Sequence, residues 1–181
     1  MLSRGSFERV ASTLVIPALR ALGDAWAAGR VSVAAEHAAS HAVLRRLAAA
    51  FEAAGNLRAD ERPVVVGLPP GSRHELGALI FAVAARRAGL PVIYVGADLP
   101  ADAWLSATAS AAAAVIGVVT PPDRAAATEV AGMLKGERPG LVVALGGPAA
   151  ITLPGALLLP DDLPDAVDRL AAAVRGVSLT A

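Results

Sequence analysis

Short apolar runs alternate with helical patterns from Pro63 to the end of the chain, and this alternation constrains the fold more than any other feature. The predicted strands span 64–68, 92–95, 114–119, 141–145 and 156–159, and the predicted helices span 74–88, 101–111, 123–135 and 163–175. Almost continuously apolar strands that are separated by helices are typical of a parallel sheet covered on both faces. We therefore predict an α/β fold with a flavodoxin- or Rossmann-like five-stranded parallel sheet.

The N-terminal part of the chain has a helical pattern instead. Apolar residues recur at intervals of three to five between 6 and 28, which predicts one helix with a kink at Pro17. Ser32 is the expected N-cap of a second helix that runs to about residue 54. The expected inner face of this helix consists of Val33, His37, Val43, Leu44, Leu47 and Phe51. A polar stretch then separates two predicted domains, a helical cap at 1–56 and a sheet domain at 62–181.

Charge and composition argue against several classes of function. The 181 residues carry 16 basic and 16 acidic side chains, so we expect no nucleic-acid-binding surface, which needs a basic excess. The chain has no cysteine, which excludes thiol nucleophiles and zinc–thiolate sites. No apolar run reaches the ~20 residues of a membrane span, and no signal-peptide pattern opens the chain, so we expect a cytoplasmic protein without membrane contact. No serine lies in a Gly-x-Ser-x-Gly elbow, and we expect no enzymatic activity.

His74 is the strongest candidate for a metal ligand. It lies between the first predicted strand and the first predicted helix of the sheet domain. Ligands of open α/β sheets bind at this carboxyl end of the strands. The helix dipole disfavours the charged form of an imidazole at a helix N-terminus, and a metal requires the neutral form. Gly77 leaves the first helical turn without a side chain, so that a bulky ligand can lie against it.

Two motifs in separate segments resemble the cobalamin-binding part of MerR-type, adenosylcobalamin-dependent light-sensing regulators. The first is Trp26, followed after nine residues by Glu36-His37, and the second is His74 with Gly77 three residues later. The sequence around both motifs also resembles that of the family, including residues 29–33, residues 69–71 and the glycine pair 146–147. The resemblance implies a helical bundle above a B12-binding domain. It also implies cobalamin as the cofactor, with adenosylcobalamin as the favoured form. It also implies that His74 ligates cobalt from below.

The same resemblance implies roles for individual residues. Trp26 would cover the upper face of the corrin, Glu36 would bond the adenosyl sugar, and His37 would lie nearby. The full set implied to contact the cofactor is Trp26, Val33, Glu36, His37, Ser72, Arg73, His74, Glu75, Leu76, Gly77, Val118, Thr120, Gly146 and Gly147. Two positions depart from the family pattern. Ser72 stands where an acid orients the ligand histidine, and Ile116 stands where a serine bonds the cofactor tail.

These features lead to the hypothesis of a cobalamin-binding sensor, light-responsive or antirepressor-like. We expect it to signal through a partner protein or by self-association, without binding nucleic acid directly. Two alternatives remain: a corrinoid carrier of a methyltransferase system, and a repurposed B12-type domain that holds another tetrapyrrole. Self-association is expected because two cap helices cannot both cover a cofactor and hide apolar residues such as Leu14 and Phe51. The basic pair Arg86-Arg87 is interpreted as part of a solvated face.

Overall fold

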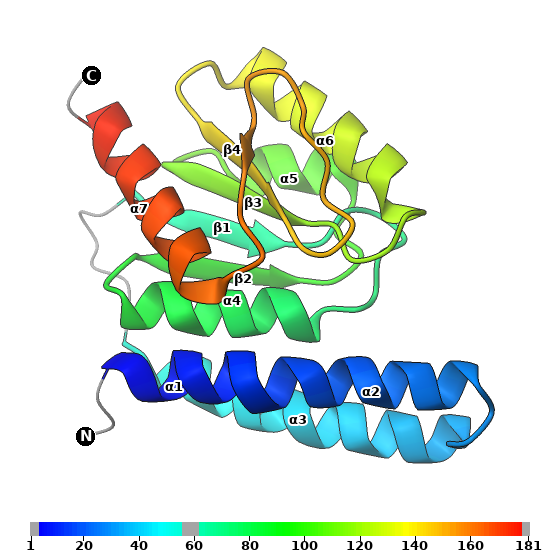
Figure 1. Cartoon of the computed structure of the whole chain (residues 1–181). Coiled ribbons are helices and arrows are strands. Elements are labelled where there is room, and N and C mark those ends of the chain that lie inside the picture. The colour runs from blue at the N-terminus through cyan, green and yellow to red at the C-terminus, as the bar shows by residue number, and fades with distance from the viewer. Residues whose placement is uncertain (1–3, 56–61, 179–181) are drawn as a thin grey trace.

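A parallel five-stranded sheet forms the centre of the molecule (Figure 1). The computed structural model describes residues 4–55 and 62–178, so the predicted domain boundary at 56–61 lies outside the described residues. The strands are β1 (Val64–Gly67), β2 (Val92–Gly96), β3 (Ala113–Gly117), β4 (Val142–Gly146) and β5 (Leu157–Leu158), in the order β2-β1-β3-β4-β5. Every neighbouring pair is parallel, which confirms the predicted α/β fold with a five-stranded parallel sheet.

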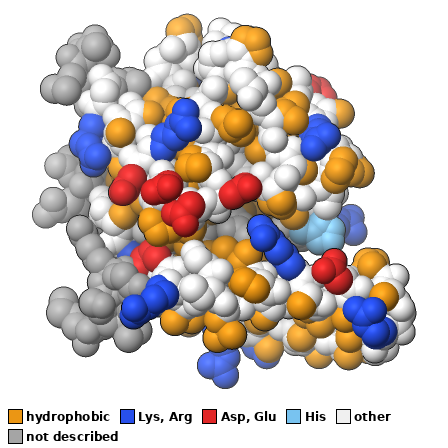
Figure 2. Space-filling model, viewed as in Figure 1, with side chains coloured by type: hydrophobic (Ala, Val, Ile, Leu, Met, Phe, Trp, Pro, Cys, Tyr) orange, Lys and Arg blue, Asp and Glu red, His pale blue; other side chains and the backbone are white. Residues whose placement is uncertain are grey.

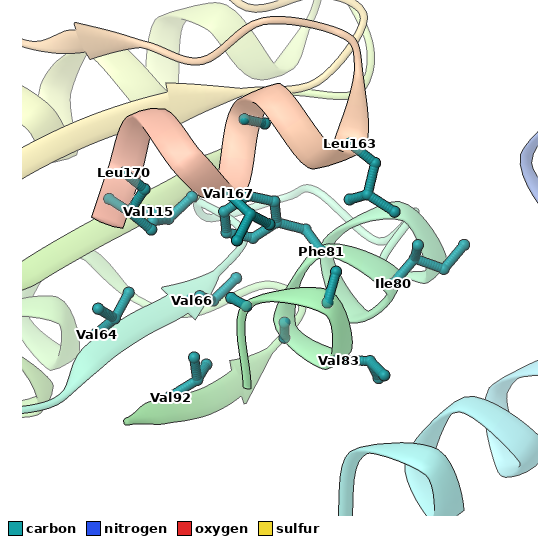
Figure 3. Packing of buried hydrophobic residues seen from close by; sticks show 14 of the residues in the cluster. Val64, Val66, Ile80, Phe81, Val83, Val92, Val115, Leu163, Val167 and Leu170 are labelled. Carbon is teal, nitrogen blue, oxygen red and sulfur yellow. The ribbon is translucent and has the colours of Figure 1, made fainter. Parts of the chain in front are cut away.

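Helices cover both faces of this sheet. They are α4 (Leu76–Arg87), α5 (Ala101–Ala107), α6 (Asp123–Glu137) and α7 (Leu163–Ser178). On one face, α4 and α7 enclose a buried cluster that contains Val66, Phe81 and Val167 (Figure 3). On the opposite face, α5 and α6 contribute Trp104 and Leu134 to a second buried cluster. The continuous apolar character of the strands therefore reflects burial on both faces.

Local hydrogen bonds explain where the elements end earlier or later than predicted. The helix predicted over 101–111 ends at Ala107, because the N–H groups of Ala109 and Ala111 donate to carbonyls three residues back instead of four, which forms turns. The strand predicted over 114–119 ends at Gly117, because the next free backbone N–H groups donate to the carboxylate of Asp123. The helix predicted from 74 begins at Leu76, which leaves His74 in the preceding loop.

The N-terminal helices form a hairpin that lies along α4 (Figure 1). Its elements are α1 (Arg4–Val10), the π-helical segment η1 (Ala11–Val15), α2 (Ile16–Ala27) and α3 (Val33–Ala53). The predicted kink at Pro17 is instead this π segment, in which the Ile16 N–H donates to the Ala11 carbonyl. Pro17 has no N–H and its ring crowds the preceding turn, and the wider π turn accommodates both effects. Ser32 is the N-cap of α3, as predicted, and its hydroxyl accepts from the Ala35 N–H at 3.2 Å.

Only the second half of α3 has the predicted inner face. Leu47 and Phe51 are buried, and Val43 and Leu44 pack against the same cluster. Val33 and His37 were predicted to face inward, and this prediction is wrong: both are exposed. The far end of the hairpin, where α2 ends and α3 begins, extends past α4, so no core lies there for these side chains to join (Figure 1). None of the described helices is both long and apolar enough to cross a bilayer.

The interpretation of Arg86-Arg87 as a solvated face is also wrong. Arg86 Nη1 donates to the carbonyls of Phe51 and Gly55 at 3.0 Å each, and Nε and Nη2 donate to the Val92 carbonyl. Arg87 pairs with Glu8 at 3.1 Å. The last carbonyls of a helix have no partner within the helix, so Arg86 satisfies the end of α3. The basic pair joins the hairpin to the sheet domain.

Candidate functional site

His74 lies in the loop that joins β1 to α4, at the carboxyl edge of the sheet, as the sequence predicted. Gly71 adopts a positive φ of 81°, and the Ser72 N–H donates back to the Pro69 carbonyl at 3.1 Å, which closes a turn. Ser72 is buried and Glu75 is half-buried, whereas Arg73 and His74 are exposed. The loop therefore anchors its two ends and presents Arg73 and His74 outward.

The side chain of Glu75 is directed to the neighbouring strand β2. The Tyr94 hydroxyl donates to Glu75 Oε2 at 2.8 Å. Burial raises the pKa of Tyr94, and the hydrogen bond to Glu75 and the charge of Glu75 raise that pKa further. Tyr94 therefore remains a neutral donor, and Glu75 is held away from His74. On the following turn, a Cβ added to Gly77 would meet no atom within 4 Å, so the start of α4 is open there, while Leu76 packs against the core.

Ser72 and Asp123 form a buried polar pair beneath the loop. Ser72 is 1% exposed and Asp123 is 7% exposed. No hydrogen bond within normal geometry reaches Ser72 Oγ among the described residues, although the hydroxyl lies close enough to Asp123 to affect its pKa. Burial raises the pKa of Asp123, but the hydrogen bonds from Thr120 and Val119, together with the nearby Ser72 hydroxyl, outweigh burial and lower that pKa overall. Asp123 is therefore a stably charged carboxylate at the end of β3.

The ends of β3 and β4 meet backbone to backbone at the same edge. Gly117 pairs with Gly146, and the Val118 N–H donates to the Gly146 carbonyl at 2.8 Å. Gly147 has φ +111°, and a Cβ there would lie 2.6 Å from the Val118 carbonyl oxygen, so only glycine fits. The Val118 side chain is fully buried, which leaves only its backbone for a ligand, and Thr120 is half-buried.

A second group of predicted site residues lies at the far end of the hairpin. Trp26 is 49% exposed and Val33 is 66% exposed. Glu36 accepts a hydrogen bond from the Ser40 hydroxyl at 2.6 Å. The rings of His37 and His41 are in edge contact, with centroids 4.8 Å apart. Within 4–55 and 62–178, no hydrogen bond or ion pair joins this hairpin group to the His74 loop. The structure thus divides the predicted site into an edge group and a hairpin group.

Sequence reasoning missed two acids at the sheet edge. Asp98 and Asp123 are far apart in the sequence, yet each holds a loop of this edge. Asp98 accepts from the Gly71 N–H at 2.6 Å, and Asp123 accepts from the Thr120 N–H at 2.7 Å. Each acid follows a predicted strand within a few residues, and that position is the signal that could have found both.

The side chains at this edge suit a metal ion that is already held by a macrocyclic cofactor and needs only one ligand from the protein. Among the described residues, no group of three or more His, Asp or Glu side chains could hold a metal ion. His74 is an exposed imidazole at the edge without a second donor beside it, which is sufficient for one axial position of a macrocyclic complex but not for a bare ion. The residues present therefore fit cobalt held in a corrin ring.

Comparison with known families agrees with this geometry. Residues 62–174 match the family model described as a B12 binding domain. The chain belongs to the B12-binding domain family. Residues 1–50 match a second family model that is also described as a B12 binding domain. The two matches confirm the family resemblance, and they support cobalamin as the cofactor of this B12-binding domain chain.

Two curated relatives of this B12-binding domain chain come from Myxococcus xanthus. The HTH-type transcriptional repressor CarA is 33% identical over 96 residues, which cover 53% of this chain and 31% of the relative. The HTH-type transcriptional repressor CarH is 31% identical over 140 residues, which cover 76% of this chain and 46% of the relative. The chain thus spans less than half the length of these relatives.

Solved structures of corrinoid proteins share the fold. The monomethylamine corrinoid protein of Methanosarcina barkeri has a TM-score of 0.69 at 12% identity, over 87% of this chain and 78% of that chain. The methanol:cobalamin methyltransferase complex MtaBC of the same organism has a TM-score of 0.59 at 19% identity, over 92% and 67%. A cobalamin-binding protein from Desulfitobacterium hafniense has a TM-score of 0.54 at 18% identity, over 86% and 77%. At these identities the likeness shows the fold.

Proposed function

We propose that this chain is a cobalamin-binding sensor module in which His74 ligates cobalt from the lower face. The observation that carries the proposal is the exposed imidazole of His74, held at the carboxyl edge of the sheet by a loop whose flanking residues are anchored. The match of 62–174 to a B12 binding domain supports a corrin as the source of the remaining cobalt ligands. The role of the chain is binding, and we assign no catalytic residue.

The edge group would hold the lower half of the cofactor. We place the cofactor tail past Gly77, Thr120 and the pair Gly146-Gly147. The open space at Gly77 and the close backbone contact between the ends of β3 and β4 support this path, because glycine lets the backbone approach a ligand closely. Backbone atoms would then make most of the other contacts with the cofactor, because the neighbouring side chains are buried, anchored or directed to solvent. These neighbours are Ser72, Arg73, Glu75, Leu76 and Val118.

The hairpin group would cover the upper face. When bound, adenosylcobalamin supplies a cobalt–carbon bond that light can break. The far end of the hairpin extends past α4 on the side where the His74 loop lies, which supports a position of Trp26 and Glu36 above the ring (Figure 1). The indole of Trp26 offers a flat apolar surface at low entropic cost, and the carboxylate of Glu36 can accept from sugar hydroxyls. Val33 and His37 would line the same side.

The hairpin surface would also carry the signal. Val10, Leu14, Trp26 and Val33 are large hydrophobic residues that remain exposed. Figure 2 shows hydrophobic side chains spread along the hairpin. Scattered apolar residues are ordinary on a protein surface, but their concentration on one element is typical of an interaction surface. We propose that a second copy or a partner regulator covers the part of this surface around Val10 and Leu14, which lies outside the group placed against the cofactor, and that loss of the upper ligand changes the contact.

A corrinoid carrier for a methyltransferase is the second candidate. The half-exposed position of Trp26 favours it, because a partner enzyme must reach the upper face of a carrier's cofactor. A carrier accepts a methyl group from a partner in the dark, whereas a sensor responds to light with a change in assembly. Another tetrapyrrole in the same site is an outcome that the absorption spectrum distinguishes directly.

The test is reconstitution of the full chain with adenosylcobalamin, followed by absorption spectra in the dark and after illumination. We expect the dark spectrum of a histidine-ligated cobalt and a light-induced change in spectrum and in oligomeric state. His74→Ala should weaken binding sharply and change the dark spectrum to that of base-ligated or water-ligated cobalt. His41→Ala, which removes another exposed imidazole, is the matched control and should retain the wild-type dark spectrum. Unchanged affinity and spectrum in His74→Ala would refute the ligation.

A further inference from the structure

Asp98 has an unusual backbone conformation next to the His74 loop. It lies just after β2 and, among the described residues, it alone has a positive φ without being glycine, at 55°. Asp tolerates the left-handed region better than most residues, but the conformation is still sparsely populated. Such a conformation persists only where the surrounding contacts fix it, and these positions cluster at functional sites. The contacts of Asp98 therefore indicate which part of the site this conformation stabilises.

Those contacts reach three consecutive residues, the three directly before His74. Oδ1 of Asp98 accepts from the Gly71 N–H at 2.6 Å, and the Asp98 N–H donates to the Ser72 carbonyl at 2.9 Å. Oδ2 lies 3.8 Å from Nη2 of Arg73. In this left-handed conformation, both the side chain and the N–H of Asp98 face the same loop. One residue thus fixes the backbone of the loop on the side that precedes His74.

The two backbone contacts matter more than the ion pair. The Arg73 side chain is 81% exposed, and an exposed pair at this separation stabilises little. A hydrogen bond from a backbone N–H to a carboxylate is short and strong by comparison. On the other side of His74, Tyr94 holds Glu75 through its carboxylate at 2.8 Å. His74 therefore lies between two anchored points, both held from β2 or the residues directly after it.

We propose that Asp98 is a positioning residue that holds the His74 loop in the conformation in which the imidazole reaches the cobalt. This inference rests on the proposed ligation by His74. The residue two positions before His74 is Ser72, which is buried and cannot act as an orienting acid. Asp98 lies in a different loop and restrains His74 indirectly, because it bonds the backbone before His74 and not the imidazole itself. A ligand held in place beforehand loses less entropy on binding, so the loop contact contributes to affinity.

A set of substitutions distinguishes the effect of the hydrogen bond from the effects of the backbone conformation and of the ion pair. Asp98→Ala removes the acceptor and disfavours the positive φ. Asp98→Gly suits the positive φ but also lacks the acceptor. Asp98→Asn keeps an acceptor and tolerates the left-handed conformation, so it is the rescue variant. Arg73→Gln removes only the ion pair. Asp102→Ala, an exposed acid in the first turn of α5, is the matched control.

The first readout is amide hydrogen exchange of the cobalamin-free protein, which does not depend on ligation. We expect faster exchange at Gly71 in Asp98→Ala and Asp98→Gly, and wild-type exchange in Asp98→Asn, Arg73→Gln and Asp102→Ala. The second readout is cobalamin affinity and the dark spectrum. Asp98→Ala and Asp98→Gly should bind about tenfold more weakly, as expected for the loss of one charge-assisted hydrogen bond, with a mixture of histidine-ligated and water-ligated cobalt.

The possible results distinguish the two proposals. If His74→Ala changes the spectrum but Asp98→Gly matches wild type in exchange, affinity and spectrum, the positioning role of Asp98 is wrong while the ligation stands. If Asp98→Asn fails to restore the wild-type properties, the hydrogen bond is not what positions the loop, and the proposal is also overturned. If His74→Ala leaves the spectrum unchanged, the ligation itself is wrong, and the positioning proposal falls with it regardless of the exchange data.

Discussion

The guanidinium of Arg86 lies 3.5 Å from the centroid of the Phe51 ring and donates to the Phe51 carbonyl at 3.0 Å. Arg86 belongs to α4 and Phe51 to the last turn of α3, so this pair joins the hairpin to the sheet domain. Burial lowers the pKa of Arg86, and the charge of Glu52 opposes that shift in part. The guanidinium remains charged under all ordinary conditions, so the contact does not depend on pH.

Arg86→Lys should therefore lower the free energy of unfolding by about 2–4 kcal/mol, because an ammonium cannot replace the planar fork that bonds several carbonyls at once. Chemical denaturation of the cobalamin-free protein measures the effect. Arg46→Lys, on the exposed side of α3, is the control and should change stability by less than about 0.5 kcal/mol. Equal stability of the two variants would mean that the hydrogen bonds of Arg86 do not hold the hairpin to the sheet domain.

Asp123→Ala should reduce stability at neutral pH by about 1–3 kcal/mol, because it leaves the N–H groups of Val119 and Thr120 without their acceptor. The pKa of Asp123 is lowered in the folded protein, so its contribution is complete above the ordinary carboxyl pKa of about 3.9. It is lost as the pH falls through the lower folded pKa. Denaturation midpoints of wild type and variant should converge on acidification. A difference that stays constant down to pH ~2 would contradict the hydrogen-bond assignment.

Trp26→Ala should reduce the preference for adenosylcobalamin over methylcobalamin by roughly 1–3 kcal/mol, the range for loss of one large aromatic contact. Because Trp26 is half-exposed without cofactor, the unfolding free energy of the cobalamin-free protein should change little. Titrations with both cofactors measure the preference. Leu14→Ala, another exposed apolar residue of the hairpin, should leave the preference unchanged. Equal weakening for both cofactors in Trp26→Ala would leave this residue with a packing role only.

Leu14→Glu should weaken self-association of the cobalamin-bound protein at least tenfold, because it places a charge in the proposed contact surface. Leu14 is 63% exposed, so the folded chain itself should tolerate the change. Sedimentation velocity over a concentration series measures the association. Ala49→Glu, beside the exposed residues Arg45 and Arg46, is the matched control and should associate like wild type. A wild-type protein that stays monomeric at high concentration would refute self-association through this surface.

Periodicity predicted the sheet domain well because the local pattern and the tertiary burial agree there. The runs that become β1, β3 and β4 are apolar at nearly every position, and each is largely buried between two helical layers. The ends of elements were predicted less well. They depend on local hydrogen bonds, such as those that Asp123 accepts from Val119 and Thr120, which an apolar pattern does not reveal.

The candidate site was only partly predictable for a related reason. The position of His74 was predictable because a short loop between a strand and a helix has a fixed place at the sheet edge. The supporting residues Asp98 and Tyr94 reach this loop from 19 to 27 positions away in the sequence. Arg86 was misassigned because a basic residue on a helix is usually solvated, and its carbonyl partners belong to another element.

The π segment Ala11–Val15 fixes the direction in which Trp26 points around the axis of the hairpin. A π turn holds one residue more than an α turn, and each residue of an α-helix rotates the chain by about 100°. If the same residues formed a continuous α-helix instead, everything beyond the segment, the indole included, would be rotated by about that angle. α1 would stay docked through Glu8 and Arg87. The direction of the proposed cofactor-facing side chains thus depends on a segment well upstream of the residues themselves.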